Sequence, residues 1–374
     1  MKPLWITVCL LLTCGVVMAS EGEGESETEN WYDRIGFNGL FYLTYEDGEL
    51  GGDSYSRFFV TRAYLTAEAE ILPFLDGRIT LDTAQDLEGQ GRGDMEVRLK
   101  YAFAKFRFKD YGLFNDPNLE AGIVHMVWLD FEEHINLYRM RGPMFMERSG
   151  IFNSADFGLT FASSLGPDLD EAFRSLAGNK YGTRNGSLAV GVYNGTGYHG
   201  DERNVNKTVE VRLTWRPIPD LLKGFQVAGM IIHGEGNQPD EGGEPPMWKT
   251  YTAFTSYQAP RVTLTGQYVR GEGNQRGTWV EPDDPSQAIP YTGYSFFGEA
   301  KLGSRKKWRV IANYDWFERV ADSGNDSSFT YLEAAIGYDL GKSNILMLDF
   351  DRRAWRDPLR PTDYRVQAVL QLMF

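Results

Sequence analysis

The sequence predicts an all-β fold, a transmembrane antiparallel β-barrel of about 16 strands. Apolar and polar residues alternate with a period of two, turn residues separate the alternating segments, and long and short connections follow one another in turn. The chain of 374 residues is 14% aromatic, yet its mean hydropathy is only −0.39. Such a composition fits a barrel whose apolar outward face touches lipid and whose polar inward face encloses water.

The alternation is clearest in the segment "TVEVRLTW", which ends at Trp215. Its Val, Leu and Trp residues alternate with Glu, Arg and Thr, as in a strand with one apolar and one polar face. Most of the predicted strands are about ten residues long, a length that crosses a bilayer when the strand is tilted. The predicted strands are 34–45, 57–71, 77–86, 95–109, 118–127, 156–165, 186–194, 206–216, 223–234, 248–258, 261–271, 292–302, 307–318, 328–340, 343–353 and 363–374.

The connections sort by length. "PFLD", "QAP", "GSRK" and "LGKS" are short, whereas "EDGELGGDSYS", "EGNQPDEGGEPPM" and "EGNQRGTWVEPDDPSQAIPY" are long. Long loops on one rim and tight turns on the other are typical of outer-membrane barrels. One connection, "GPDLDEAFRSLAGNKYGTRNG", falls on the short-turn side but is long, and we expect part of it to form a small helix.

The C-terminal segment "PTDYRVQAVLQLMF" is apolar at every second residue back from Phe374. We expect this last strand to pair with the first strand, because each unpaired backbone group in hydrocarbon costs several kcal/mol. A terminal Phe resembles the C-terminal signal of bacterial outer-membrane proteins. We therefore interpret Phe374 as an assembly signal at the membrane interface and predict a location in the bacterial cell outer membrane.

Residues 1–19 are predicted to be a signal peptide, with a basic start at Lys2, an apolar run and small residues at its end. A membrane anchor would need about 20 apolar residues, and a lipoprotein would need a better cleavage box than "LLTC" before Cys14. Residues 20–33 are predicted to be an acidic disordered spacer, and 34–374 the barrel domain. The net charge of −14 argues against a general nucleic-acid binder.

Motifs for catalysis are scarce. The sequence contains no G-x-S-x-G elbow, no P-loop and no H-E-x-x-H, and its four histidines lack metal-ligand spacing. We therefore predict no enzyme activity and no catalytic, cofactor-binding or metal site. Two alternatives remain: an outer-membrane enzyme built on a barrel, and a secreted soluble β-rich glycan-binding protein that uses Trp and Tyr for stacking.

The longest loop on its rim follows the fifth predicted strand and reads "LDFEEHINLYRMRGPMFMERSGIFNSA". A barrel of about 16 strands leaves an aqueous channel, and a loop of this length can fold inward and narrow it. Charged side chains at such a constriction bias which ions pass; the alternative is that these charges pair and merely keep the interior wet. The predicted constriction residues are Arg139, Arg141, Glu147 and Arg148, and the predicted lumen-facing charges are Arg62, Arg78, Asp82, Lys105 and Arg107.

Several stretches together resemble the phosphate-selective porin O and P family: "LEAGIVHMVWLDFEE", "PMFMERSGIF", "DFGLTFASSL", "LAVGVYNGTG" and "VEVRLTWRPIP". The resemblance implies a homotrimeric outer-membrane porin for passive diffusion of small hydrophilic solutes or ions, with anions such as phosphate among the candidates. Glu147 and Arg148 carry over as constriction-loop residues. The chain has His125 near the position of a family lysine, so the solute stays open.

Overall fold

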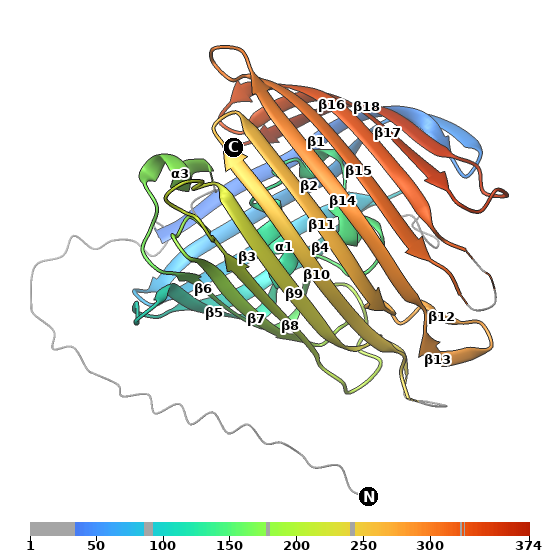
Figure 1. The fold of residues 1–374 in the computed structure, drawn as a ribbon, viewed down its shortest axis with the longest axis horizontal. Helices are drawn as coiled ribbons and strands as arrows, with labels where there is room; N and C mark the ends of the chain where they lie inside the picture. Colours follow the sequence, from blue (N-terminus) through green and yellow to red (C-terminus); the bar gives the residue numbers. More distant parts are fainter. Residues whose placement is uncertain (1–33, 86–92, 177–179, 240–243, 322–323, 325) are drawn as a thin grey trace, which may run out of the picture.

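A computed structural model describes residues 34–85, 93–176, 180–239, 244–321, 324 and 326–374. Within these residues, sixteen antiparallel strands close into one barrel, in which the last strand pairs with the first (Figure 1). The predicted fold class and the predicted pairing of the terminal strands are therefore confirmed. The predicted signal peptide and acidic spacer lie outside the described residues and stay predictions.

The strands alternate in direction around the barrel, and a small hairpin, β12–β13, stands apart from it. The short helices lie in two connections, and no helix in the described part of the chain is long and apolar enough to cross a membrane. The elements are β1 (Ile35–Leu50), β2 (Asp53–Leu72), β3 (Leu75–Gln85), β4 (Met95–Arg107), β5 (Phe114–His125), α1 (Val127–Glu133), η2 (Arg139–Arg141), α2 (Phe145–Arg148), β6 (Ala155–Leu165), α3 (Glu171–Leu176), β7 (Gly186–Tyr193), β8 (Thr208–Trp215), β9 (Phe225–Glu235), β10 (Met247–Ala259), β11 (Val262–Glu272), β12 (Val280–Glu281), β13 (Asp284–Ala288), β14 (Pro290–Leu302), β15 (Trp308–Arg319), β16 (Phe329–Gly341), β17 (Asn344–Trp355) and β18 (Asp363–Met373).

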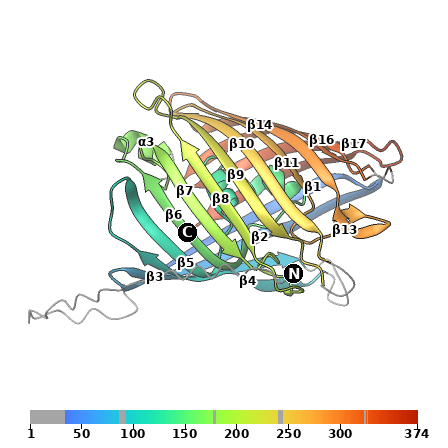
Figure 2. The same ribbon diagram turned by 60° about the horizontal axis from the view of Figure 1, so that its bottom comes forward.

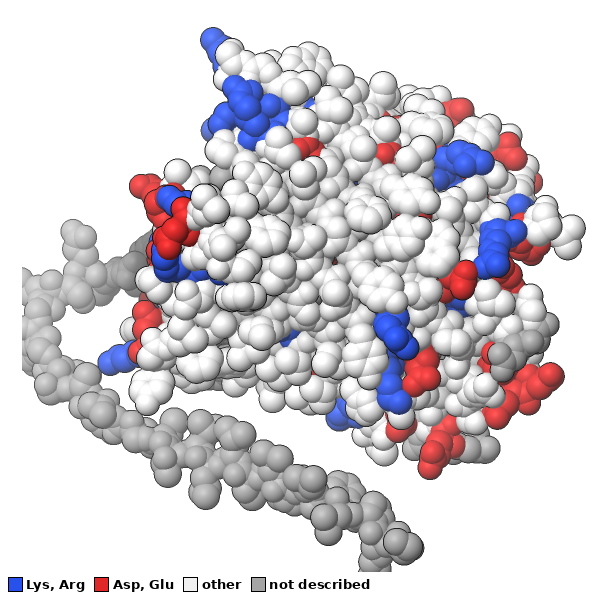
Figure 3. Space-filling view, in the orientation of Figure 1, with Lys and Arg blue, Asp and Glu red and all other residues white. Residues whose placement is uncertain are grey.

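The outward face of the barrel is apolar, whereas its inward face is polar over much of its area and apolar where residues 126–154 pack against it. In β8, Glu210 and Arg212 are buried in the interior, whereas Leu213 and Trp215 are 53% and 57% exposed. On the face drawn in Figure 3, the outward surface between the two rims carries few charged side chains, and Lys, Arg, Asp and Glu gather toward its ends. The period-two pattern therefore places apolar residues on the outward face, where no second protein layer covers them.

The two rims differ as the sequence predicted, with one correction. The turn rim, which carries tight turns such as 260–261 and 342–343, is also the end at which the chain enters β1 and leaves β18. The predicted long loop "EDGELGGDSYS" is instead the two-residue turn Gly51–Gly52, because β1 and β2 continue up to it. Both glycines have positive φ, 62° and 92°, the conformation that two-residue hairpins require.

The connection 166–185 is the predicted exception. It lies on the turn rim, is long, and contains the small helix α3, as expected (Figure 1). Its later residues, Lys180 and Tyr181, line the cavity described below. This connection therefore reaches from the rim into the barrel interior.

The closing pair of strands ends at Phe374. Backbone N–H and C=O groups of Gly39 and Phe374 bond reciprocally at 2.8 and 3.0 Å. The Phe374 ring lies over Gly39 and is 6.2 Å from the Phe41 ring, with 77% of the residue exposed. The place of this ring outside the barrel is compatible with an interfacial position, and its role in assembly stays a prediction.

Candidate functional site in the barrel interior

Residues 126–154, which connect β5 to β6, lie inside the barrel; we call them the inner loop. Figure 2 shows their helices within the ring of strands. The loop begins with α1, whose first backbone N–H groups, on Val127 and Trp128, both donate to the carboxylate of Glu210 in β8 at 3.0 Å. A carboxylate at a helix N-terminus satisfies backbone donors that have no partner within the helix. Glu210 therefore fastens the start of the loop to the wall.

Aromatic side chains hold α1 against the same wall. The ring of Trp128 is 5.4 Å from that of Phe254 in β10, and the ring of Phe131 is 5.7 Å from it. Arg212 of β8 stacks over Phe131 at 4.5 Å. Trp128 and Phe131 are fully buried, so this half of the loop is a packed element rather than a free segment.

The second half of the inner loop is fastened to another part of the wall, at β15 and β16, by ion pairs. Arg141 lies 2.5 Å from Glu333 of β16, and Arg148 lies 2.5 Å from Asp315 of β15. Gln367 of β18 donates to the backbone carbonyl of Arg141 at 3.0 Å. Because all four charged side chains are at least nine-tenths buried, these pairs act as anchors.

These contacts divide the four predicted constriction residues. Arg139 lines the main cavity, where its Nε lies 3.2 Å from a Glu133 carboxylate oxygen and its Nη2 lies 3.2 Å from Glu147. Arg141 and Arg148 face the wall of β15 and β16 instead. The structure thus brings Arg139 and Glu147 together as a pair and places the other two arginines behind the loop.

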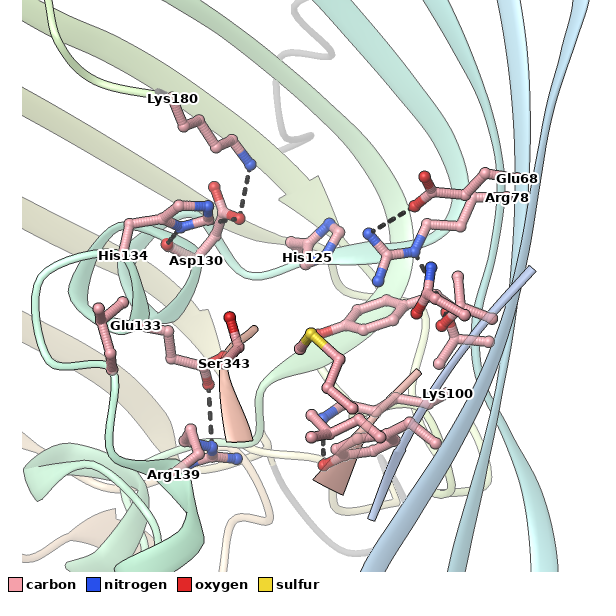
Figure 4. A pocket seen from close by; sticks show the side chains of 18 of the residues that line it. Glu68, Arg78, Lys100, His125, Asp130, Glu133, His134, Arg139, Lys180 and Ser343 are labelled. Atoms are coloured by element: carbon pink, nitrogen blue, oxygen red, sulfur yellow. Dashed lines mark hydrogen bonds and ion pairs between the residues drawn. The ribbon is translucent and has the colours of Figure 1, made fainter. Parts of the chain in front are cut away.

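The main cavity has a volume of about 950 Å³ and lies between the inner loop and the turn rim. Its lining includes strand ends at that rim, among them Asp76, Lys105 and Ser343. In Figure 4, Glu133 and Arg139 face the cavity from the inner loop, opposite Lys100 and Arg78. The cavity therefore carries charges of both signs on facing sides.

The predicted lumen-facing charges all have partners, and four of the five partners are oppositely charged groups. This supports the interpretation that paired charges keep much of the interior wet. The contacts are Arg78–Glu68 at 3.3 Å, Asp82–Arg98 at 3.0 Å, Lys105–Glu120 at 4.0 Å, Arg107–Asp76 at 3.2 Å and Arg62–Tyr64 hydroxyl at 2.8 Å.

Lys100 and Arg62 differ from these pairs. Both donate to the same Tyr64 hydroxyl oxygen, Lys100 at 3.1 Å and Arg62 at 2.8 Å. Lys100 is only 4% exposed and also lies 4.6 Å from the centre of the Tyr64 ring. Among the described residues, no carboxylate forms an ion pair with either cation. Lys100 lines the cavity, whereas Arg62 does not, and the carboxylate of Glu147 is close enough to interact electrostatically with both cations.

The inward orientation of Lys100 follows from a bulge that period-two counting does not reveal. Lys100 and Lys105 are five residues apart, so a regular strand would put them on opposite faces. The register of β3 against β4 shifts at Thr80 and Leu81, and Lys100 is the extra residue opposite that point. A bulge changes the parity of the strand, and both lysines therefore line the cavity.

Asp130 of α1 joins the inner loop to the connection 166–185. Lys180 Nζ lies 2.6 Å from Asp130 Oδ1, and the Tyr181 hydroxyl donates to the same carboxylate (Figure 4 shows Lys180 and Asp130). Burial would raise the pKa of Asp130, but the charges of Lys180 and His134 hold that pKa well below its usual range. Asp130 is therefore an ionised link between two segments far apart in the sequence.

Glu132 is buried on the other side of α1 and accepts a hydrogen bond from Trp128 Nε1 at 2.9 Å. Burial raises the pKa of Glu132 to about 8, and the charge of Arg148 only partly opposes this. The carboxyl group is thus mostly protonated at neutral pH. Among the described residues, no group of three or more His, Cys, Asp or Glu could hold a metal ion.

No family model and no curated protein sequence matches the chain. Solved structures do match. OmpF of Salmonella typhi, in complex with daunomycin, has a TM-score of 0.63 at 13% identity, over 91% of this chain and 97% of that chain. An anion-selective porin from Comamonas acidovorans has a TM-score of 0.60 at 12% identity, over 91% and 99%. A loop-deletion mutant of OmpT, an outer membrane protein of Vibrio cholerae, has a TM-score of 0.57 at 12% identity, over 90% and 99%.

At these identities the likeness concerns the fold. Membership of the phosphate-selective porin O and P family stays a prediction. The chain shares the closed sixteen-stranded barrel of these porins.

Proposed function

We propose that this protein is a porin of a bacterial outer membrane, through which small hydrophilic solutes or ions diffuse passively. The observation that carries the proposal is the barrel itself: apolar outside, polar over much of its inward face, with a cavity of about 950 Å³ beside an inward-folded loop. Only a closed barrel or a helix satisfies its backbone groups within lipid. The fold likeness to OmpF and to an anion-selective porin supports a channel rather than an enzyme.

We also propose that anions are favoured over cations. The main support is Lys100, which lines the cavity and forms no ion pair among the described residues, whereas most other charged groups of the interior are paired. Fixed charges at a narrow point of a channel raise the local concentration of ions of opposite sign. Phosphate is one candidate among these anions, supported by the resemblance of the "FMERS" and "GVYNG" segments.

The test is the reversal potential of the refolded mature protein in a planar bilayer with a salt gradient across it. We expect an anion-favouring potential, and a shift toward cations in Lys100→Met, because Lys100 lines the cavity. At an effective dielectric constant of about 20, one charge about 7 Å from an ion contributes about 2 kcal/mol before screening. Screening by mobile ions reduces this to about 1 kcal/mol, so we expect the change to lower the anion-to-cation permeability ratio roughly fivefold.

Lys207→Met is the matched control, because Lys207 is exposed on the loop rim and lies outside the lining of the cavity. If the wild-type protein favours cations, the proposed anion preference is wrong but the proposed porin function stands. Folded, inserted protein without any conductance would count against the porin itself.

We propose a homotrimer as the assembly. One fold neighbour, in-vitro folded OmpT of Vibrio cholerae, is described as a trimer form and has a TM-score of 0.54. The apolar outward face offers area for contact between copies as well as for lipid. Conductance steps in groups of three, with a matching mass in detergent, would support the trimer; single independent steps would count against it.

A further inference from the structure

The turn rim of the barrel carries one sector whose charge is almost entirely positive. Three hairpin turns meet there: 260–261, 303–307 and 342–343, from β10–β11, β14–β15 and β16–β17. These hairpins are neighbours, because β11 pairs with β14 and β15 pairs with β16. We define the basic sector as Arg261, Arg305, Lys306, Lys307 and Lys342.

Three residues of the basic sector are exposed and two, Lys306 and Lys307, are half-buried, and its turns contain no acidic residue. The turn sequences "APRV", "LGSRKKW" and "LGKSN" contain neither Asp nor Glu. Arg305 and Lys342 are exposed, and Arg261 donates to the backbone carbonyl of Gly303 at 3.0 Å, which ties two of the turns together. Figure 3 shows Lys and Arg gathered at the upper left, where the β14–β15 hairpin ends in Figure 1. In a chain of net charge −14, this concentration of cations is unusual.

Two other connections of the same rim, 166–185 and 216–224, hold exposed charges that are paired. Arg184 pairs with Asp220, and Lys223 pairs with Asp170, on the turns that flank β7, β8 and β9. Arg174 pairs with Asp168 in the connection that holds α3. The positive charge of the basic sector is therefore a local property of three hairpins.

Directly beside the basic sector, the outward face is apolar and aromatic. Leu302, Trp308 and Leu340 are 48%, 48% and 49% exposed at the ends of the same strands. The Trp308 ring packs against Tyr338 at 4.9 Å, and Lys307 Nζ lies 5.6 Å from the Tyr338 ring. Cations at a rim, next to aromatic side chains and then to aliphatic ones, match the order of headgroup, interface and acyl chain in a lipid.

We propose that the basic sector binds the phosphate-bearing headgroup of an anionic phospholipid in the leaflet that meets the turn rim. This rests on the proposed membrane location but not on conduction through the barrel. The cations would contact the headgroup while Leu302, Trp308 and Leu340 contact its acyl chains. A free anion would use the cations alone and leave the adjoining apolar surface without a role, which is why a lipid fits better.

The test uses quenching of Trp308 fluorescence by brominated lipids. The protein is reconstituted in equal mixtures of phosphatidylcholine and phosphatidylglycerol in which only one of the two lipids is brominated. The Trp308 signal is the difference between the protein and its Trp308→Phe variant. We expect brominated phosphatidylglycerol to quench Trp308 with a roughly fivefold preference, which is about 1 kcal/mol, the contribution of one Lys or Arg near an anionic membrane surface.

The variant R305Q/K306Q/K307Q/K342Q should lose this preference, whereas R203Q/K207Q/R276Q/R360Q, with the same change of charge on loop-rim residues, should keep it. High salt should also abolish the preference in the unmodified protein, which needs no variant to fold. Equal quenching by both lipids in the unmodified protein would overturn the proposal. Absence of quenching by either brominated lipid would instead overturn the membrane location.

Discussion

The guanidinium of Arg141 lies 2.5 Å from the carboxylate of Glu333, and the two side chains are only 5% and 2% exposed. Arg141 belongs to the inner loop and Glu333 to β16, so this buried pair fastens the loop to the barrel wall. Removing one partner of a buried pair leaves an uncompensated charge and typically costs about 3–5 kcal/mol. We predict that Arg141→Leu lowers the free energy of unfolding by about 3 kcal/mol.

The measurement is denaturant unfolding of the barrel in detergent, followed by tryptophan fluorescence, together with the noise of the open-channel current. The double variant Arg141→Leu, Glu333→Leu should recover much of the loss, because it removes both charges. Arg203→Leu, at an exposed loop-rim position, serves as the control. Unchanged stability and noise in Arg141→Leu would show that the pair does not hold the loop.

The second prediction concerns ion selectivity and Arg139, which lines the cavity and pairs with Glu133 and Glu147. Burial opposes ionisation of Glu147, but the charge of Arg139 lowers the pKa of Glu147 to about 2. Arg139→Gln should leave negative charge at the cavity and shift selectivity toward cations, roughly fivefold in permeability ratio. The reversal potential at pH 8 measures this shift.

The neutralisation of Arg139, Arg141 and Arg148 together should give the same shift as Arg139→Gln alone, since the other two arginines face the wall. The shift in Arg139→Gln should shrink at acidic pH, because Glu147 without its partner titrates at a higher pKa. A larger shift from Arg148→Gln than from Arg139→Gln would contradict the assignment.

We predict that the buried carboxyl group of Glu132 makes the free energy of unfolding depend on pH. Burial raises the pKa of Glu132 to about 8 from its ordinary 4.5. Between these values the folded state keeps a proton that the unfolded state has lost, so this group lowers stability as pH rises. Glu132→Gln should therefore stabilise the protein increasingly from pH 5 to pH 8, by at most about 1.4 kcal/mol for each pH unit.

Unfolding free energies of wild type and Glu132→Gln at three pH values in this window test the sign. Glu133→Gln is the neighbouring control, since Glu133 pairs with Arg139 and its loss should not stabilise the fold. A stability difference that stays constant or falls with rising pH would rule out a protonated Glu132.

The contact between Phe374 and Gly39, where the last strand meets the first, can be tested by substitution at Gly39. A Cβ atom on Gly39 would lie 2.4 Å from Phe374 Cζ, whereas one on Gly36 would meet nothing nearer than 3.9 Å. Gly39→Val should therefore displace the terminal ring and cost about 1–3 kcal/mol through overpacking, and Gly36→Val should cost less.

The measurement is the fraction of protein that folds into lipid vesicles, read from the mobility difference between heated and unheated samples. If Phe374 is an assembly signal, Phe374→Ser should slow folding and Gly39→Val should act in the same direction. If the same fraction of Gly39→Val and Gly36→Val folds into vesicles, the contact of the Phe374 ring with Gly39 does not matter for folding.

The sequence by itself determined the barrel. Strand alternation, loop asymmetry and the terminal Phe374 predicted the sixteen strands and their closure, and the structure confirms both. Such features are local, because each strand carries its own two-faced pattern and each turn its own residues. The sequence predicts a long loop where the structure has the turn Gly51–Gly52, because the residue pattern does not show where strand pairing stops.

Only the tertiary structure decided which charges can meet a solute. The sequence placed Arg139, Arg141 and Arg148 together in one loop, but their partners Glu147, Glu333 and Asp315 decide which of them lines the cavity. These partners lie far away in the sequence for Arg141 and Arg148, and pairing across a barrel depends on its closure. The bulge that turns Lys100 inward is likewise a property of two strands in register. A single strand carries its pattern, whereas the field inside the barrel arises from all of them together.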